Sequence, residues 1–433
     1  MAQVAIAVGV ALVSAYLQYA LTPGSRTESG KLSELELPKS GLGQNIPIVW
    51  GAAKFSTNAV WGRKQTQKVK KKKSGKGTKS STKTYTYTGS AQYLLCKGPI
   101  VGISRVWISG KLVYNVLSSA STKEYNASVK WRNKNATFYL GTETQNPDAH
   151  LQQHIGVNKT SAHRGYAYLV LKDFNVTDYG GRYPDIAVEV VQKGYFNESG
   201  RLVPQAVTVA EVVQNAIALI GFPSNLIDTS ETAGMELNGY VITGNTDIKS
   251  IINNCSSAFH LTTTEREGKI ILRRKDRPKV STSLSSYPAF VDGNRPGDYE
   301  IKRIDQVQIP SEISVSCLGV DKDYEKVVLT ARMPRSYGEA NNNNLDLPML
   351  LSSDFAQKLA ITLLRETQLS RTTYKFTLPG SYGYLEPGDI VTATIKGKTR
   401  QLQIQKISIG QDYVITFECA EYSSQIYYGK ATA

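Results

Sequence analysis

The feature that most constrains this chain is a period-two alternation of β-branched or aromatic residues with polar ones, which recurs in two long stretches. It is clear in Tyr85-Thr86-Tyr87-Thr88 and again over residues 372–428, where tight turns contain Pro-Gly or Lys-Gly. Because successive side chains of a strand point to opposite faces, this pattern predicts half-buried strands joined by turns. We therefore expect an α+β protein that is mainly β.

The first β-rich unit is expected to span residues 38–206. Short segments that contain Asn, Gly and Pro separate its apolar runs, and these residues are typical of turns between strands. Residues 63–90 carry a lysine run interleaved with Ser, Gly and Thr, which is typical of a solvated loop inserted between two strands. Strands are expected at residues 46–51, 58–62, 85–98, 100–108, 112–116, 136–140, 165–172 and 185–192.

A small α+β module is expected over residues 207–300, where helical spacing replaces the alternation. Thr208-Val-Ala-Glu211 is a capping box, and apolar residues follow it at helical spacing as far as Gly221. The module should hold helices at 208–221 and 246–259, a strand at 239–242 and a hairpin at 261–274 that turns at Glu267-Gly268.

The last unit, residues 301–433, is expected to be a second β-barrel with one helix over residues 352–368. Residues 303–329 have the composition of strands, and the Asn run 341–344 is interpreted as an exposed loop. Within the final alternating block, Pro387, Gly388 and Asp389 form the turn motif of this barrel.

Residues 1–26 are expected to form an apolar helix, because residues 2–21 contain no charged residue and Thr22-Pro23-Gly24 is a stop signal. The stretch is just long enough to cross a bilayer. However, no basic region precedes it, and it is rich in Ala and Val and contains Gln, Ser and Tyr. It is interpreted as a helix that packs against partner subunits, with a membrane span as the alternative.

The excess of positive charge is concentrated in one segment. Lys and Arg number 51 against 36 Asp and Glu, a net charge of +15. From Arg63 to Lys83 there are one Arg, nine Lys and no acid, so removing these ten residues leaves about +5 (15 − 10). A nucleic-acid binder with a basic fold would keep its charge after such a removal. The net charge alone is therefore weak support for binding DNA or RNA.

Candidate catalytic residues are few. The four Cys lie far apart with no CxxC pair, which excludes a disulfide-dense scaffold and a zinc site built from Cys. His150 and His154 are spaced to share one helix face and hold a metal, with Asp148 and His163 as further ligands. The alternative is that they are surface histidines on a short helix. No catalytic, metal or cofactor-binding residue is assigned, and no enzymatic activity is expected.

Five segments, taken in order, resemble the baseplate hub or tail-tip proteins of tailed bacteriophages and gene transfer agents. These proteins are related to the hub part of the lambda tail-tip attachment protein. Each segment alone is a weak signal, whereas their order and spacing over most of the chain are specific. The segments are residues 42–51, 93–107, 164–174, 179–190 and 376–391.

The resemblance implies two β-barrel domains of the tail-tube type with smaller peripheral α/β domains. It also implies a homotrimer at the distal end of the virion tail. Such a trimer joins the tail tube or distal tail protein to a central spike or fibres and closes the tube before DNA ejection. A receptor-binding or glycan-binding tail module is one alternative function, and a cell-wall hydrolase is another.

Two sets of residues are predicted to contact partners. Three copies of the N-terminal helix are expected to bundle on the ring axis and meet the end of the tape-measure protein, and the helix residues that would pack are Val4, Val8, Ala11, Leu12 and Ala15. The basic loop is expected to dock on an acidic neighbour or to make transient contact with DNA or the host envelope, through Lys68, Lys70, Lys71, Lys72, Lys73 and Lys76.

Overall fold

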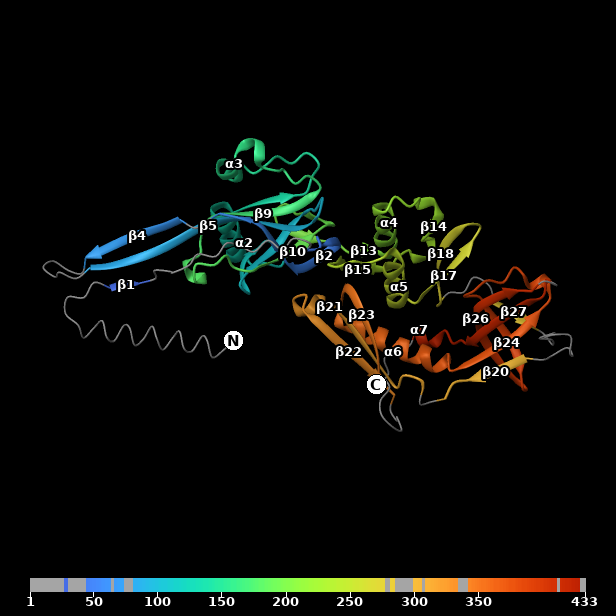
Figure 1. Ribbon diagram of the computed structural model, residues 1–433. Helices are drawn as coiled ribbons and strands as arrows, with labels where there is room; N and C mark the ends of the chain where they lie inside the picture. The colour runs from blue at the N-terminus through green and yellow to red at the C-terminus, as the bar shows by residue number, and fades with distance from the viewer. Residues whose placement is uncertain are drawn as a thin grey trace. The chain divides into compact units, whose positions relative to one another are not determined.

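The computed structural model describes residues 27–29, 44–63, 66–73, 81–276, 281–284, 299–305, 308–333, 342–410 and 413–428 (Figure 1). The chain divides into two compact units. Unit 1 comprises Met1–Ile48 and Lys54–Val203, and unit 2 comprises Val49–Ala53 and Pro204–Ala433. The apolar helix expected over residues 1–26 lies outside the described residues. Among the helices that are described, none is long and apolar enough to cross a membrane.

Strand β9 (Tyr166–Asn175) runs through the core of unit 1. Its residues Ala167 to Leu171 are all fully buried. On one face, Tyr168 and Val170 pack against Leu151 of helix α3 (Ala149–Ile155). Burial on both faces explains why this strand is a continuous apolar run rather than an alternating one.

Unit 1 contains two main sheets. The larger sheet has the order β1-β5-β9-β8, and β3 and β4 also pair with β5. The smaller sheet includes the strands of unit 1 in the order β10-β6-β7. The remaining elements are β1 (Thr27–Ser29), β3 (Asn58–Gly62), β4 (Thr66–Lys73), β5 (Ser81–Lys97), β6 (Gly102–Ile108), β7 (Lys111–Asn115), α2 (Thr122–Asn135), β8 (Ala136–Leu140), β10 (Ile186–Val191), β11 (Gly194–Phe196) and β12 (Leu202–Pro204).

Unit 2 contains a mixed sheet with the order β22-β21-β23-β16, which residues 49–53 of β2 (Ile48–Ser56) extend. Helix α6 packs on β21 and β22. The elements of this part are β16 (Gly239–Ile242), β21 (Glu312–Gly319), β22 (Lys326–Arg332), β23 (Asn342–Leu351) and α6 (Ser353–Leu369).

The backbones of β2 and β16 approach each other so closely that only glycine fits between them. A Cβ added to Gly239 would lie 1.8 Å from the carbonyl oxygen of Ala52. Gly51 has a φ of +76°, and a Cβ there would lie 2.5 Å from the carbonyl oxygen of Asn238. Glycine allows both the close approach and the positive φ.

The rest of unit 2 is a small helical module and a six-stranded sheet. The module has the three-stranded sheet β14-β18-β17 and the pair β13-β15, whereas the large sheet has the order β19-β25-β26-β27-β24-β20. The elements are β13 (Val207–Thr208), α4 (Val209–Leu219), β14 (Ile227–Asp228), β15 (Glu236–Leu237), α5 (Ile248–Ala258), β17 (Leu261–Arg266), β18 (Lys269–Arg274), β19 (Ser281–Leu284), β20 (Tyr299–Arg303), β24 (Thr372–Leu378), β25 (Ile390–Ile395), β26 (Lys398–Ile409), β27 (Ile415–Glu421) and α7 (Gln425–Tyr428).

Most of the expected elements are confirmed, and the protein is mainly β. The capping box at Thr208 and Glu211 is present, with both reciprocal hydrogen bonds. The hairpin β17–β18 turns at Glu267-Gly268, as the sequence indicates. Helix α6 begins after its N-cap Ser352, close to the expected start.

The expectation of closed barrels is wrong for the described residues. The large sheet of unit 2 ends at β19 on one edge and at β20 on the other, and these two strands do not pair. The error has a simple reason. Alternation and tight turns look the same in a barrel and in an open sheet, because closure depends on long-range register that neither pattern encodes.

Three further expectations need correction. The basic segment expected as a loop is largely paired, because β4 and β5 form an antiparallel ribbon. The Asn run expected as an exposed loop is exposed over residues 342–344, but these residues lie in β23 and pair with β21. Helix α2 was not expected, because it buries only Ser128 and so lacks an apolar stripe. Its capping box, Ser121 and Glu124, was the available signal.

Candidate functional site

The basic ribbon β4–β5 of unit 1 carries several lysines and no acid over residues 66–73 and 81–88. Its eight register pairs run from Thr66↔Thr88 to Lys73↔Ser81. Figure 1 shows β4 and β5 extending side by side, with β1 next to their outer part. Of the predicted partner-contact residues, Lys68 and Lys70 are exposed. Lys71, Lys72 and Lys73 are described only as strand positions, and Lys76 lies outside the described residues.

The ribbon is anchored because β5 continues into the sheet of unit 1. The side chain of Tyr87 is 1% exposed, its N–H donates to Thr177 Oγ1 at 2.8 Å, and its carbonyl accepts from the N–H of Val176 at 2.9 Å. On the opposite edge of β5, β1 pairs in parallel with residues 82–84. These contacts hold β5 in an extended conformation, so that β4 can pair along it.

The predicted turn motif, Pro387-Gly388-Asp389, contributes Asp389 to a buried ion pair. Arg273, on β18, donates from Nη2 to Asp389 Oδ1 at 2.7 Å, and the two side chains are only 4% and 2% exposed. Nη1 of Arg273 reaches Glu386 Oε2 at 3.3 Å and the Pro387 carbonyl at 3.2 Å. Asp389 Oδ2 also accepts the N–H of Glu386 at 2.9 Å. The turn thus fixes the β17–β18 hairpin to the large sheet of unit 2.

Gly388 is required at the centre of this turn. Its φ is +95°, a conformation that residues with a side chain rarely adopt. A Cβ there would also lie 3.1 Å from Thr262 of the hairpin. The sequence predicts the turn but not the role of Arg273, because nothing local distinguishes this residue from the other basic residues of the expected hairpin.

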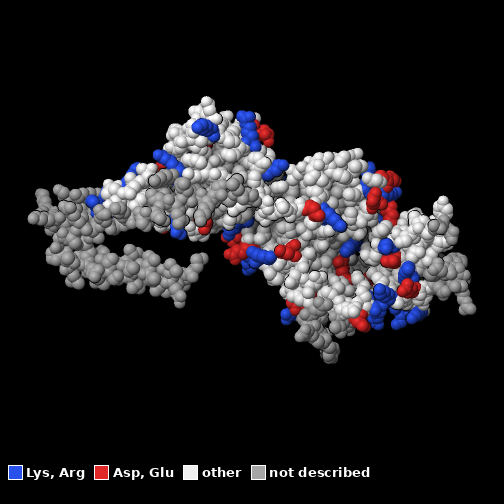
Figure 2. Space-filling view, viewed as in Figure 1, with Lys and Arg blue, Asp and Glu red and all other residues white. Residues whose placement is uncertain are grey.

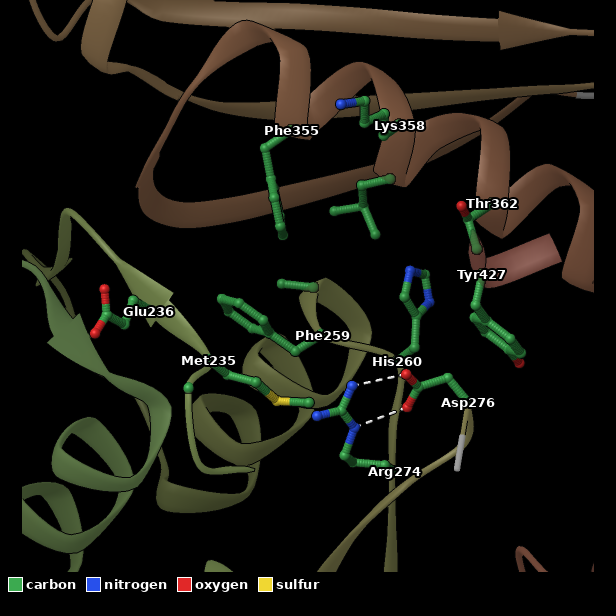
Figure 3. Close-up of a pocket in the computed structure, with 13 residues that line it drawn as sticks. Met235, Glu236, Phe259, His260, Arg274, Asp276, Phe355, Lys358, Thr362 and Tyr427 are labelled. Atoms are coloured by element: carbon green, nitrogen blue, oxygen red, sulfur yellow. Dashed lines mark hydrogen bonds and ion pairs between the residues drawn. The ribbon is translucent and has the colours of Figure 1, made fainter. Parts of the chain in front are cut away.

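A pocket of about 430 Å³ lies in unit 2, beside helix α6 and the ends of α5 and β18 (Figure 3). Phe259 and Phe355 contribute aromatic walls, with ring centroids 5.5 Å apart. The charged wall is internally paired, because Arg274 donates to both carboxylate oxygens of Asp276 at 2.7 and 2.8 Å. These two opposite charges offset each other, so they give the pocket little preference for a charged ligand.

Glu366 lies beside this pocket in a polar network. Its Oε1 accepts from the Tyr427 hydroxyl at 2.7 Å and lies 3.7 Å from both His260 Nδ1 and Lys275 Nζ. Burial favours the neutral acid, but the interactions with His260, Lys275 and Tyr427 outweigh it and hold the pKa of Glu366 below its usual range. Glu366 was not identified from the sequence, because its partners come from three separate segments.

The two histidines with metal-ligand spacing do lie together on α3, with ring centroids 4.6 Å apart. His150 Nε2 lies 2.8 Å from Ser90 Oγ, and His154 Nε2 lies 3.4 Å from Arg63 Nη1. Asp148 instead caps α3, where Oδ1 accepts the N–H of Leu151 at 2.8 Å. In the described part of the chain, no group of three or more His, Cys, Asp or Glu could hold a metal ion.

Charge is mixed over unit 2. In the view of Figure 2, Lys and Arg side chains alternate with Asp and Glu side chains over the described surface of this unit. Exposed pairs such as Lys326 with Asp346 contribute to this pattern. The ribbon strands of unit 1, by contrast, contain several Lys and no acid over residues 66–73 and 81–88.

Residues 247–407 match a family model described as a putative phage tail protein. No curated protein matches the chain. Among solved structures, a chain in the virion of a native gene transfer agent particle is 22% identical with a TM-score of 0.71, covering 99% of this chain and 98% of that one.

Two further structures match less well. A tail protein from Neisseria meningitidis MC58 is 11% identical with a TM-score of 0.37, covering 78% of this chain and 89% of that one. The 43 kDa tail protein of prophage MuSo2 from Shewanella oneidensis is 10% identical with a TM-score of 0.34, covering 78% and 90%. These two scores are too low to support an argument about the fold. The family match confirms a resemblance to phage tail proteins over residues 247–407, and the chain shares its fold with a protein of a gene transfer agent virion.

Proposed function

We propose that this chain is the structural hub of a tail tip, at the distal end of the virion. Three copies form a ring that joins the tail tube or distal tail protein to a central spike or fibres and closes the tube before DNA ejection. The observation that carries the proposal is the fold shared, over nearly the whole of both chains, with a protein of the gene transfer agent virion. The phage tail match over residues 247–407 supports the same assignment.

The open sheet edges of unit 2 support assembly with neighbouring copies. Among the described strands, β22 pairs only with β21, and β20 pairs only with β24. Val328 on β22 is 57% exposed. An unpaired edge with exposed apolar residues readily adds a strand from another chain, and a closed ring would cover such edges.

The oligomeric mass of the purified full-length chain tests this proposal. The expected species has three times the 47.5 kDa of one chain by light scattering. The Val328→Lys variant should lower the trimer fraction, because an edge lysine blocks strand addition. Val157→Lys is the matched control, since Val157 is 68% exposed and lies outside any strand. A chain that stays monomeric at high concentration would refute the ring.

The N-terminal helix has its own test within this proposal. Three copies would pack on the ring axis through Val4, Val8, Ala11, Leu12 and Ala15 and meet the end of the tape-measure protein. Deleting residues 1–24 should impair tip closure or assembly, as seen in micrographs of the particles. Particles with intact, closed tips would count against this role.

A receptor-binding or glycan-binding module is the second candidate, and exposed aromatic residues in unit 2 favour it. Tyr382 and Tyr384 stack with ring centroids 6.3 Å apart, and Tyr384 is 55% exposed. Tyr413 is 80% exposed, and its carbonyl oxygen lies 3.0 Å from where a Cβ on Gly380 would be. Screening the purified chain and its Tyr384→Ala variant against host glycans tests this candidate. Binding that the variant loses would support it, and no binding would dismiss it.

A further inference from the structure

One face of the ribbon β4–β5 combines lysines with threonine hydroxyls. Lys68 is opposite Thr86 in the register, and Lys70 is opposite Thr84, so these four side chains share a face. Lys68, Lys70 and Thr84 are exposed, and Thr86 is half-buried. Neither of the two lysines forms an ion pair with another described residue. Within the described residues, nothing therefore offsets these two charges.

The other face of the ribbon has a different role. Val69 is opposite Tyr85, and Gln67 is opposite Tyr87. Both tyrosines are buried, at 6% and 1% exposure. On β4, by contrast, Gln67 and Val69 of this face are exposed, and neither carries a charge. The lysine face is therefore the one on which exposed ammonium groups lie opposite hydroxyl groups.

The chemistry of the lysine face fits a phosphodiester backbone better than an acidic protein. Protein interfaces are enriched in aromatic residues and Arg and depleted in Lys, and the described ribbon strands contain no Arg or Trp. Lysine is a mobile point charge, well suited to a polyanion without fixed geometry. Lysine ammonium and threonine hydroxyl groups are both common donors to phosphate oxygens.

The dimensions of the ribbon also fit double-stranded DNA. With a rise of about 3.4 Å per residue, eight register pairs span about 27 Å, and Lys68 and Lys70 are about 6.8 Å apart. A duplex carries one phosphate per about 3.4 Å on each strand, so each lysine has a phosphate within reach.

We infer that the lysine face of the ribbon β4–β5 binds the phosphate backbone of double-stranded DNA without sequence preference. Binding depends on release of counterions and therefore weakens steeply as salt increases. This inference does not depend on the hub role, because a monomeric chain would present the same face. The low charge of the rest of the chain does not oppose it, because the contact is confined to one ribbon.

Fluorescence anisotropy of the full-length chain with a labelled 30-base-pair random duplex tests the inference, between 50 and 200 mM salt. Lys68→Gln/Lys70→Gln removes two phosphate contacts and should make the slope of log K against log salt shallower by about 1.8. The ratio of wild-type to variant affinity should then change about tenfold over this salt range. Lys68→Arg/Lys70→Arg keeps both charges and should bind like the wild type.

Lys123→Gln/Lys130→Gln is the matched control, because both lysines are exposed on α2 of the same unit and the net charge changes equally. This control should leave the slope unchanged. Equal slopes for wild type and the ribbon variant, or an equal effect of the α2 variant, would overturn the inference. If poly-L-glutamate displaces the duplex charge for charge, the face recognises carboxylates of an acidic protein, and the inference is wrong.

Discussion

Replacing Asp389 by Asn should destabilise unit 2, because it removes the charge of the nearer and more buried of the two carboxylates that pair with the buried Arg273 guanidinium. The side chains of Arg273 and Asp389 are at most 4% exposed, and their contact is 2.7 Å long. The substitution keeps the shape of the side chain and an oxygen that can accept the N–H of Glu386. It therefore isolates the loss of charge from the loss of packing.

The magnitude follows from burial. Removing one partner of a buried pair costs about 3–5 kcal/mol, since the remaining charge can neither be hydrated nor neutralised. Arg273 keeps its contacts with Glu386 Oε2 at 3.3 Å and the Pro387 carbonyl at 3.2 Å. We therefore expect the lower end of this range, about 3 kcal/mol.

Hydrogen exchange measured by mass spectrometry on the full chain is the suitable assay, because it resolves the β17–β18 hairpin from the rest. A loss of about 3 kcal/mol corresponds to about a hundredfold lower protection, since each 1.4 kcal/mol is a factor of ten. The decrease should appear in peptides covering residues 261–274 and 386–404.

Two comparisons make the result interpretable. Asp346→Asn removes the partner of Lys326 in an exposed pair, whose side chains are 72% and 58% exposed, and should cost less than about 1 kcal/mol. The double variant Arg273→Met/Asp389→Asn removes both charges and should be less destabilised than the sum of its single variants. If Asp389→Asn changes protection no more than Asp346→Asn does, the ion pair does not hold the hairpin.

Three further predictions concern other parts of the chain. Gly239→Ala should cost about 3 kcal/mol by urea unfolding, because its Cβ would lie 1.8 Å from the Ala52 carbonyl oxygen. Because the folded pKa of Glu366 is lowered, its stabilisation is present above the unfolded pKa of about 4.3 and is lost as pH falls through the folded value. Glu366→Gln should therefore reduce the acid-side loss of stability, measured by urea unfolding between pH 7 and pH 3. Burial raises the pKa of Cys255 to about 12 and that of Cys317 to about 11, so the native chain should react slowly with a thiol reagent at pH 8.

Each of these has a clear contrary result. Wild-type stability of Gly239→Ala would mean that the two strands can separate without cost. Parallel pH profiles for wild type and Glu366→Gln would mean that the carboxylate does not contribute as described. The urea-unfolded chain serves as the thiol control, with four reactive cysteines expected, and an equal rate in the native chain would show that the thiols are accessible.

The sequence alone determined most of the local helices, strands and turns and the mainly β fold class. Capping residues such as Thr208 with Glu211 and Asp247 satisfy backbone groups at helix starts, so they mark helices by local chemistry. Period-two alternation and Gly-containing turns likewise indicated strands by local chemistry, because successive side chains of a strand point to opposite faces. The turn at Gly388 was found in this way, and so was the lysine run.

What the tertiary structure decided were the relations between distant segments. It paired the lysine run into a ribbon with β5, placed the Asn run in β23 beside β21, and left the large sheet of unit 2 open. It also brought Arg273 to Asp389, 116 residues further along the chain. Register, sheet closure and buried charge pairs depend on which surfaces meet in three dimensions, and local sequence patterns carry no information about those meetings.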